Sequence, residues 1–190
     1  VKGRFKELVF VEPVEQLLFL AAKSLTKSKT IEDDAKENFL DIFSLAKRNK
    51  LVSESLTART SKMLYPLDAV AASCLTLAIQ RYGQNERTLF SFLHDTTSNS
   101  INSFVPNATT TYNLAVVYDY IIYNFYTALS ETNLDSTNWR AIRVAIERIE
   151  SGIITKNNID DALKIVKTIG LLNLFYNGVV VDLAFLETYA

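Results

Sequence analysis

Few side chains in this sequence have the type and spacing that catalysis or metal binding requires. The one histidine, His94, and the one cysteine, Cys74, stand twenty residues apart. A zinc site on this pair would need several carboxylates as further ligands, and a thiol–imidazole nucleophile would need an exposed thiol. Cys74 instead belongs to an apolar stripe at helical spacing, which predicts a buried and unreactive thiol. None of the five glycines lies in a phosphate-binding loop pattern, so we expect neither a metal site nor a cofactor site in this chain.

Two pairs of adjacent acids are the other candidates for acid–base chemistry. They are Asp33 with Asp34 and Asp160 with Asp161. Each pair falls in the first turn of a predicted helix, where the helix dipole stabilises negative charge. This position explains the acids without a reaction, and we expect no catalytic residue among them.

The elements that could position polar groups are clearest between residues 65 and 93. Pro66 suits the first turn of a helix, and a stripe of apolar residues follows it: Leu67, Val70, Ala71, Cys74, Leu75, Ala78 and Tyr82. We expect Gly83 to end this helix in the left-handed conformation and Asn85 to cap the next helix. The polar residues at this junction are the candidate interaction residues: Arg81, Gln84, Asn85, Glu86 and Arg87. The two arginines either pair with neighbouring surface groups or reach a phosphate or a neighbouring domain.

Helical spacing recurs along the rest of the chain. It predicts helices over residues 12–25, 31–50, 111–129, 139–152 and 158–170, and a last one capped by Asp182. Phe19 and Leu20 widen the apolar face of the first helix, which predicts burial on more than one side. Residues 4–11 could form a short strand, and residues 171–181 a small hairpin around Asn177-Gly178. Residues 94–110 are mostly Ser, Thr and Asn, which is typical of a mobile or functional loop.

Composition places the chain among ordinary globular proteins. It has 190 residues, of which 48% are apolar, and its five glycines and three prolines are too few for a β-sandwich. The net charge of −1 provides no general attraction to nucleic acid or to an anionic membrane. No apolar run reaches the roughly 20 residues that span a bilayer, and a single cysteine fits a reducing cytoplasm. We therefore predict a cytoplasmic protein with no membrane partner.

We expect an all-α fold, or nearly so: an orthogonal bundle of seven or eight helices, with at most a short strand or hairpin near the ends. Residues 1–190 would form a single helical domain. A sub-boundary is possible near residues 131–138, with residues 139–190 as a C-terminal subdomain. Because the sequence opens with Val-Lys-Gly-Arg, we interpret it as an internal or trimmed piece of a longer protein.

The helix predicted over residues 111–129 is rich in tyrosine. Its five tyrosines could stack on nucleic-acid bases: Tyr112, Tyr118, Tyr120, Tyr123 and Tyr126. A platform for single strands also needs cations, and no lysine or arginine occurs from residue 111 to residue 130. We therefore interpret these tyrosines mainly as packing residues of a central helix.

Several short motifs resemble one known family. They are Gly3-Arg4-Phe5, Phe10-Val11-Glu12-Pro13, Leu64-Tyr65-Pro66-Leu67, the run from Arg81 to Leu93, and Ile169-Gly170-Leu171-Leu172-Asn173. Together they resemble the large bacterial P-loop ATPases, AAA-like, that are often carried in anti-phage and mobile-element defence loci. The run Gln-Asn-Glu-Arg-Thr-Leu-Phe-Ser-Phe-Leu is the most specific part. Relatives often carry His-Pro after Tyr-Pro-Leu, whereas Asp68 and Ala69 follow here.

The resemblance implies a helical region inserted in, or following, an ATPase core whose ATP and magnesium sites lie in other segments. The first hypothesis is thus a non-catalytic helical module that couples the core to a partner or a neighbouring domain. The rest of the ATPase chain would be one partner, and any contact with DNA would be made through the parent protein. A second is a stand-alone hydrolase or nuclease that uses Glu86, Arg87 and loop residues. A third is a nucleic-acid-binding module with a winged-helix-like part over residues 137–190.

Overall fold

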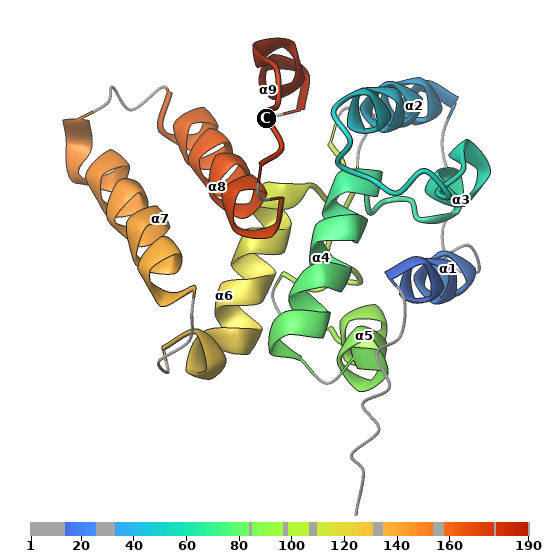
Figure 1. Ribbon diagram of the computed structural model, residues 1–190, viewed down its shortest axis with the longest axis horizontal. Helices are drawn as coiled ribbons and strands as arrows, with labels where there is room; N and C mark the ends of the chain where they lie inside the picture. The colour runs from blue at the N-terminus through green and yellow to red at the C-terminus, as the bar shows by residue number, and fades with distance from the viewer. Residues whose placement is uncertain are drawn as a thin grey trace, which may run out of the picture.

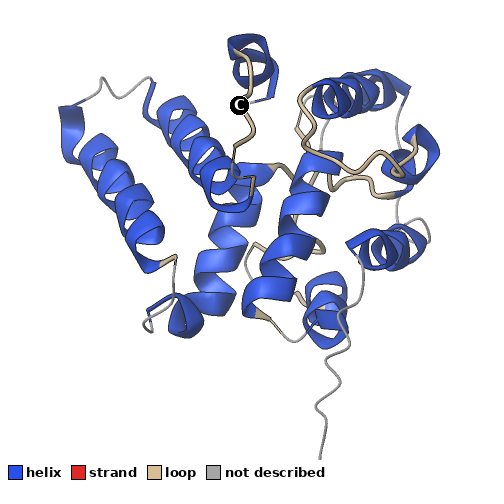
Figure 2. Cartoon of the chain, viewed as in Figure 1, coloured by secondary structure: helices blue, strands red, loops and turns tan. Residues whose placement is uncertain are grey.

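The computed structural model describes residues 14–25, 33–83, 85–96, 99–106, 110–130, 135–153, 158–176 and 178–189. This part of the chain contains nine α-helices, one short π-helical segment and no β-strand, so the predicted all-α fold is confirmed (Figure 2). The strand expected in residues 4–11 lies outside the described residues. The elements are α1 (Val14–Leu25), α2 (Asp33–Arg48), α3 (Ala58–Met63), α4 (Ala69–Tyr82), α5 (Asn85–His94), α6 (Leu114–Ser130), α7 (Ser136–Arg148), η1 (Ile149–Ile153), α8 (Ile159–Phe175) and α9 (Leu183–Tyr189).

Two central helices, α4 and α6, pack side by side, and the other helices flank them (Figure 1). Helices α1, α2 and α5 cover α4 on one side, while α8 packs on α6 and α4 from the other side and carries α7 at its outer edge. The view that shows α4 and α6 lengthwise shows α1, α2 and α5 nearly end-on, so the two sets of helices cross at steep angles. One large apolar core joins buried residues from α1 through α9, and Phe39 and Tyr65 form a small separate cluster.

Helix α4 is buried along most of its length because most of its side chains are small. Ten of its fourteen residues are buried: Ala69, Val70, Ala71, Ala72, Ser73, Cys74, Leu75, Thr76, Ala78 and Ile79. Small side chains let neighbouring helices approach it from several directions at once. Cys74 is fully buried, as predicted, and burial raises the pKa of its thiol far above the usual value.

Helix α4 begins later than the sequence predicted. Its first residue is Ala69, and Asp68 is the N-cap, whose carboxylate accepts a hydrogen bond from the Ala71 N–H at 2.8 Å. The placement of Pro66 in the first helical turn is therefore wrong. The Tyr112 N–H donates to the Pro66 carbonyl at 2.8 Å, and the Asp68 N–H donates to the Tyr112 carbonyl at 3.3 Å. These two bonds tie this part of the backbone to the segment before α6, and the helix starts only after them.

Gly83 ends α4 as predicted, but for a different reason. Its φ of −104° and ψ of −170° are extended, so the expected left-handed conformation is wrong. A Cβ atom at this position would lie 2.8 Å from the Ile79 carbonyl oxygen and 2.9 Å from Thr88 Oγ1. Glycine is required here because the chain turns back tightly between α4 and α5.

Helix α8 continues through Gly170 to Phe175, so the hairpin predicted over residues 171–181 is wrong. A Cβ atom on Gly170 would lie 2.7 Å from two side-chain atoms of Ile142 on α7. This glycine permits close packing of α7 on α8 and does not end the helix. The predicted turn survives in part, because Gly178 has a φ of +81°.

The segment between α5 and α6 is anchored where the structure describes it. Ile101 is fully buried, and the Asn102 side-chain amide donates to the carbonyls of Leu93 and Asp95 at 2.9 and 3.0 Å. The Tyr112 hydroxyl also donates to the Asn99 carbonyl. This segment is thus attached to the end of α5 and to Tyr112. The polar composition of residues 94–110, from which we predicted a mobile or functional loop, did not indicate these contacts.

The outer face of α1 differs from the prediction. Leu17, Leu18, Ala21, Ala22 and Leu25 are buried, as expected, but Phe19 is 48% exposed and Leu20 is 38% exposed. The Lys23 ammonium lies 4.5 Å from the centre of the Phe19 ring. The prediction that α1 is buried on more than one side is therefore wrong.

Among the described residues, no helix is both long and apolar enough to cross a bilayer.

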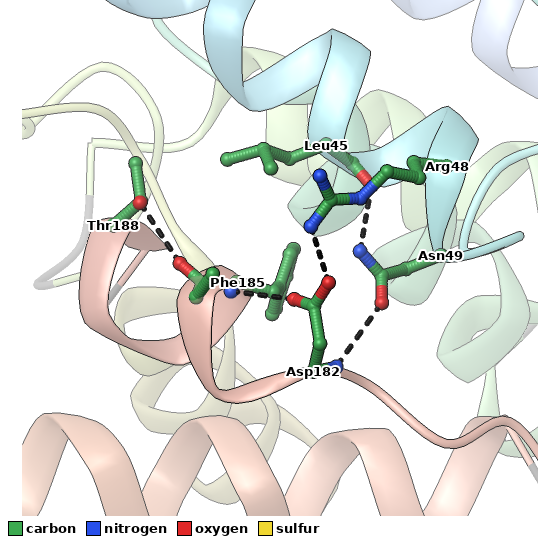
Figure 3. Close-up of polar contacts among 7 residues, drawn as sticks. Leu45, Arg48, Asn49, Asp182, Phe185 and Thr188 are labelled. Atoms are coloured by element: carbon green, nitrogen blue, oxygen red, sulfur yellow. Dashed lines mark hydrogen bonds and ion pairs between the residues drawn. The ribbon is translucent and has the colours of Figure 1, made fainter.

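Helix α9 is attached to α2 by a set of polar contacts (Figure 3). The Asp182 carboxylate caps α9, as predicted, by accepting from the Phe185 N–H at 2.8 Å, and it also pairs with the Arg48 guanidinium. The Asn49 side-chain oxygen accepts from the Asp182 N–H at 3.2 Å, while its amide donates to the Leu45 carbonyl. The hydrogen bond from Phe185 and the charge of Arg48 lower the pKa of Asp182. These contacts attach α9 to the end of α2, which lies in the first half of the chain.

Candidate functional site

Arg81, a predicted interaction residue, is used within the fold. Its guanidinium donates to the Leu174 carbonyl at 3.1 Å and pairs with the Asp135 carboxylate at 3.2 Å. It also lies 5.0 Å from the centre of the Phe175 ring. Arg81 therefore joins the end of α4 to the start of α7 and the end of α8, and its groups are not directed at a ligand.

Tyr82 extends this junction into the core. Its hydroxyl donates to the Asp135 carboxylate at 2.6 Å and accepts from the Trp139 indole N–H at 3.1 Å. Burial and the neighbouring Asp135 raise the pKa of Tyr82 to about 12, so the phenol stays protonated. The junction is a structural network of neutral and paired groups.

The other predicted interaction residues are not brought to this junction by any described contact. Gln84 lies outside the described residues. Asn85 and Glu86 are in the first turn of α5, and the structure describes their backbone but not their side chains. Arg87 is exposed on the same helix. Helix α5 begins at Asn85. Because the side chain of Asn85 is not described, its role as the cap of α5 remains a prediction.

A buried carboxyl group that we did not single out for a role lies at the opposite end of α4. Asp68 is fully buried, and its oxygens accept from the Ala71 N–H, from Thr111 Oγ1 at 3.1 Å and from the Tyr189 hydroxyl at 3.0 Å. Burial outweighs these hydrogen bonds and raises the pKa of Asp68 to about 6. Its position, directly before a long run of helix-forming apolar residues, was the signal that could have identified it as an N-cap.

The Asp68 cluster is saturated, which argues against catalysis. The Tyr189 hydroxyl donates to Asp68 and accepts from the Leu114 N–H at 3.0 Å. Each polar atom of the cluster thus has a partner inside the protein. The cluster joins the starts of α4 and α6 to the C-terminal helix.

The remaining acid–base candidates that the structure describes are surface groups. Asp160 and Asp161 are exposed at the start of α8, and Asp161 pairs with Lys164 at 3.6 Å. The side chains of Asp33 and Asp34 lie outside the described residues. His94 is exposed and its ring stacks on Phe90. No group of three or more His, Cys, Asp or Glu residues is arranged to hold a metal ion in the described part of the chain.

A pocket of about 530 Å³ lies between α2, α6, α8 and α9. Its central charges, Lys167 and Asp119, are bonded to each other at 2.7 and 2.9 Å. Asn113 accepts from two N–H groups at the start of α6, and Thr111 and Tyr189 belong to the Asp68 cluster. Most of the polar groups around this pocket are therefore already occupied by partners within the protein.

A second pocket, of about 340 Å³, lies between α6 and α7 and is here named the α6–α7 groove. Its lining is apolar and aromatic with two arginines: Tyr118, Ile122, Tyr126, Leu129, Ser136, Trp139, Arg140 and Arg143. The two helices touch only lightly, since both pack on α8, and they stand apart in Figure 1. Tyr126 is 62% exposed at the groove, so much of its ring is accessible to a binding partner.

Among the described residues, the charged side chains that line the groove come from α7. Arg143 is paired with Glu147 of the same helix at 3.7 Å, and both side chains are more than half exposed. Among the described residues, Arg140 lies within ion-pair distance of no carboxylate. No acidic residue is among the described residues that line the groove. Burial raises the pKa of Tyr118 to about 12, so its phenol is neutral in the groove wall.

Sequence reasoning missed this groove for two reasons. No lysine or arginine is interleaved with the tyrosines on α6, and the two arginines belong to a separate helix whose position beside α6 cannot be inferred from local periodicity. Only the packing of both helices on α8 brings Tyr126 near Arg140 and Arg143. The tyrosines of α6 lack cations in their own helix, but the groove as a whole combines them with two arginines.

Comparison of the chain with protein-family models, curated proteins and solved structures found no match. The resemblance to P-loop ATPases accordingly stays a prediction.

Proposed function

We propose that this chain is a non-catalytic helical module of a cytoplasmic P-loop ATPase of the anti-phage or mobile-element defence type. It links a nucleotide-binding core outside this chain to a partner or a neighbouring domain. The ATPase part of the proposal rests on the resemblance of the sequence motifs. The core, and not this module, would hold ATP and magnesium.

The α6–α7 groove is the observation that supports a binding role. It combines an open aromatic wall with two cations, whereas Arg81, Tyr82 and Asp68 are bonded within the fold. Exposed aromatic residues and arginines are the groups most often found at the energetic centres of protein interfaces. The hydrolase or nuclease hypothesis is less well supported, because it depends on Glu86, whose side chain lies outside the described residues, and on Arg87, which is exposed on α5 away from the groove.

The test measures ATP turnover by the longest natural polypeptide that contains this chain. Tyr126→Ala removes an aromatic group from the groove, and Tyr123→Ala is its matched control, because Tyr123 is equally exposed on α6 but does not line the groove. We expect Tyr126→Ala to change turnover several-fold and Tyr123→Ala to leave it unchanged. Equal turnover in both variants would refute the coupling role.

A second measurement separates the module from the core. Calorimetric titration of the 190-residue chain with Mg-ATP should give no binding, because the sequence has no phosphate-binding loop. Micromolar binding would contradict the non-catalytic assignment and would favour the enzyme hypothesis.

A further inference from the structure

The α6–α7 groove has a chemical asymmetry that specifies what fills it. Its α6 side is apolar, with Ile122, Tyr126 and Leu129, and its α7 side carries Arg140 and Arg143. Trp139, also on α7, is buried, and its indole N–H donates to the Tyr82 hydroxyl. The indole N–H is therefore already paired, and the ring contributes apolar surface to the groove.

The two arginines set the charge and the spacing of the occupant. They are three residues apart on one helix, so their side chains emerge on the same side, about 4.5 Å apart along the axis. Acidic residues three or four apart on a second helix match this separation at about 4.5–6 Å. Alternate residues of an extended chain are about 6.6–7 Å apart and match it less well.

On these grounds, and resting on the proposed function, we propose that the α6–α7 groove binds an acidic amphipathic helix of a partner protein. The apolar face of that helix packs on Ile122, Tyr126 and Trp139, and acids one turn apart on its edge pair with Arg140 and Arg143. This is the helix-in-groove mode of recognition, in which a few apolar anchors are spaced by one helical turn. The weak pair between Arg143 and Glu147 is exchanged for the new one, since exposed pairs of that kind contribute little.

Single-stranded nucleic acid is the less favoured occupant. Binding to a nucleic-acid backbone draws on several cations along a track, whereas the described residues that line the groove include two arginines and no lysine. An amphipathic helix uses both the apolar wall and the two charges, and an oligonucleotide would leave Ile122 and Leu129 without a matching group.

The test uses the emission of Trp139, the chain's single tryptophan, together with the anisotropy of a labelled probe. The first probe is a model helix of about 15 residues, with leucine and phenylalanine on one face and glutamate on the other. The second has lysine in place of each glutamate, and the third is a thymidine oligonucleotide. We expect the acidic helix to bind at least about tenfold more tightly than the basic one and to change the Trp139 emission.

Charge reversal provides the matched control. Arg140→Glu together with Arg143→Glu should weaken the acidic helix at least about tenfold and should strengthen the basic one. Arg59→Glu, an exposed position on α3 at the far side of the molecule, should change neither. Exchange of preference between the two helices cannot result from simple unfolding of the variant, which would abolish binding of both.

Two outcomes would overturn the inference. One is tighter binding of the oligonucleotide than of the acidic helix; the other is self-association of the chain that quenches Trp139 without any probe. If the acidic helix fails to bind while Tyr126→Ala still alters ATP turnover, the occupant is wrong and the proposed function stands. If the acidic helix binds but the groove variants leave turnover unchanged, the coupling function fails and the docking site stands.

Discussion

At the scale of single residues, Asp68 shows how a fully buried carboxyl group can serve as a helix cap. Burial disfavours its charged form, and the hydrogen bonds from Ala71, Thr111 and Tyr189 favour that form. Burial is the larger effect, which is why the pKa of Asp68 rises to about 6. The cap contributes geometry to α4, while its charge opposes folding at neutral pH.

Asp68→Asn should therefore alter the pH dependence of stability. A rise of the pKa from 3.8 to about 6 means that the folded chain holds the proton more tightly, so Asp68 favours folding most when protonated. That contribution is lost as the pH rises from about 4 to about 6, by about 3 kcal/mol in total. Asparagine can keep the cap without titrating, so the stability of the variant relative to the natural chain should rise by this order between pH 4 and pH 7 in urea melts.

Asp182→Asn is the control for this experiment. Hydrogen bonds lower the pKa of Asp182, so its contribution is present at neutral pH and is lost as the pH falls through the folded value. The relative stability of this variant should change with pH in the opposite direction. A flat difference for Asp68→Asn would show that the carboxyl group is not desolvated as the structure shows.

At the scale of elements, glycine is decisive where two backbones approach each other. Gly170 lies in the middle of α8, where glycine is ordinarily unfavourable. It is accommodated because α7 packs so closely that Ile142 occupies the space of a missing Cβ. This contact joins the α7 edge, and with it the α6–α7 groove, to the rest of the bundle.

Gly170→Ala should destabilise the chain by about 1–3 kcal/mol through overpacking, because the β-branched Ile142 side chain has little rotamer freedom to move away. The double variant Gly170→Ala with Ile142→Ala should be more stable than the sum of the two single effects predicts, as measured by a double-mutant cycle in urea. Asn173→Ala, at an exposed position of α8, should change stability by less than about 0.5 kcal/mol. Additive effects of the two substitutions would mean that α7 and α8 are not in direct contact at Gly170.

At the scale of the whole molecule, the C-terminal helix fastens the chain. Asp182 attaches one end of α9 to α2 (Figure 3), and Tyr189 attaches the other end to Asp68 and to the start of α6. Phe185 is fully buried between these two contacts. A helix of only seven residues is thus held by contacts to three distant segments.

Tyr189→Phe should destabilise the folded chain by about 1–3 kcal/mol, since it leaves the buried Leu114 N–H without an acceptor and removes a donor from Asp68. Thr188→Ala removes a hydroxyl of the same helix that bonds only to the Ala184 carbonyl, and it should change stability by less than about 0.5 kcal/mol. Hydrogen exchange should show faster opening at the start of α4 and of α6 in the tyrosine variant. Equal protection of these amides in both variants would contradict the fastening role of α9.

The sequence alone determined the class of the fold and the inward faces of its helices, because these depend on local periodicity. Val70, Ala71, Cys74, Leu75 and Ala78 of the predicted stripe on α4 are buried, and the cap at Asp182 forms as predicted. Each of these features is decided by residues within a few positions of one another.

Only the tertiary structure decided what depends on residues far apart in the chain. The start of α4 is set by Tyr112, the role of Gly170 by Ile142, and the use of Arg81 by Asp135 and Leu174. The α6–α7 groove likewise exists because α8 holds apart two helices whose aromatic and cationic residues are unremarkable when read singly. Periodicity records which face of a helix is apolar, but the identity of the neighbour that covers that face, or leaves it open, is fixed only when the helices pack.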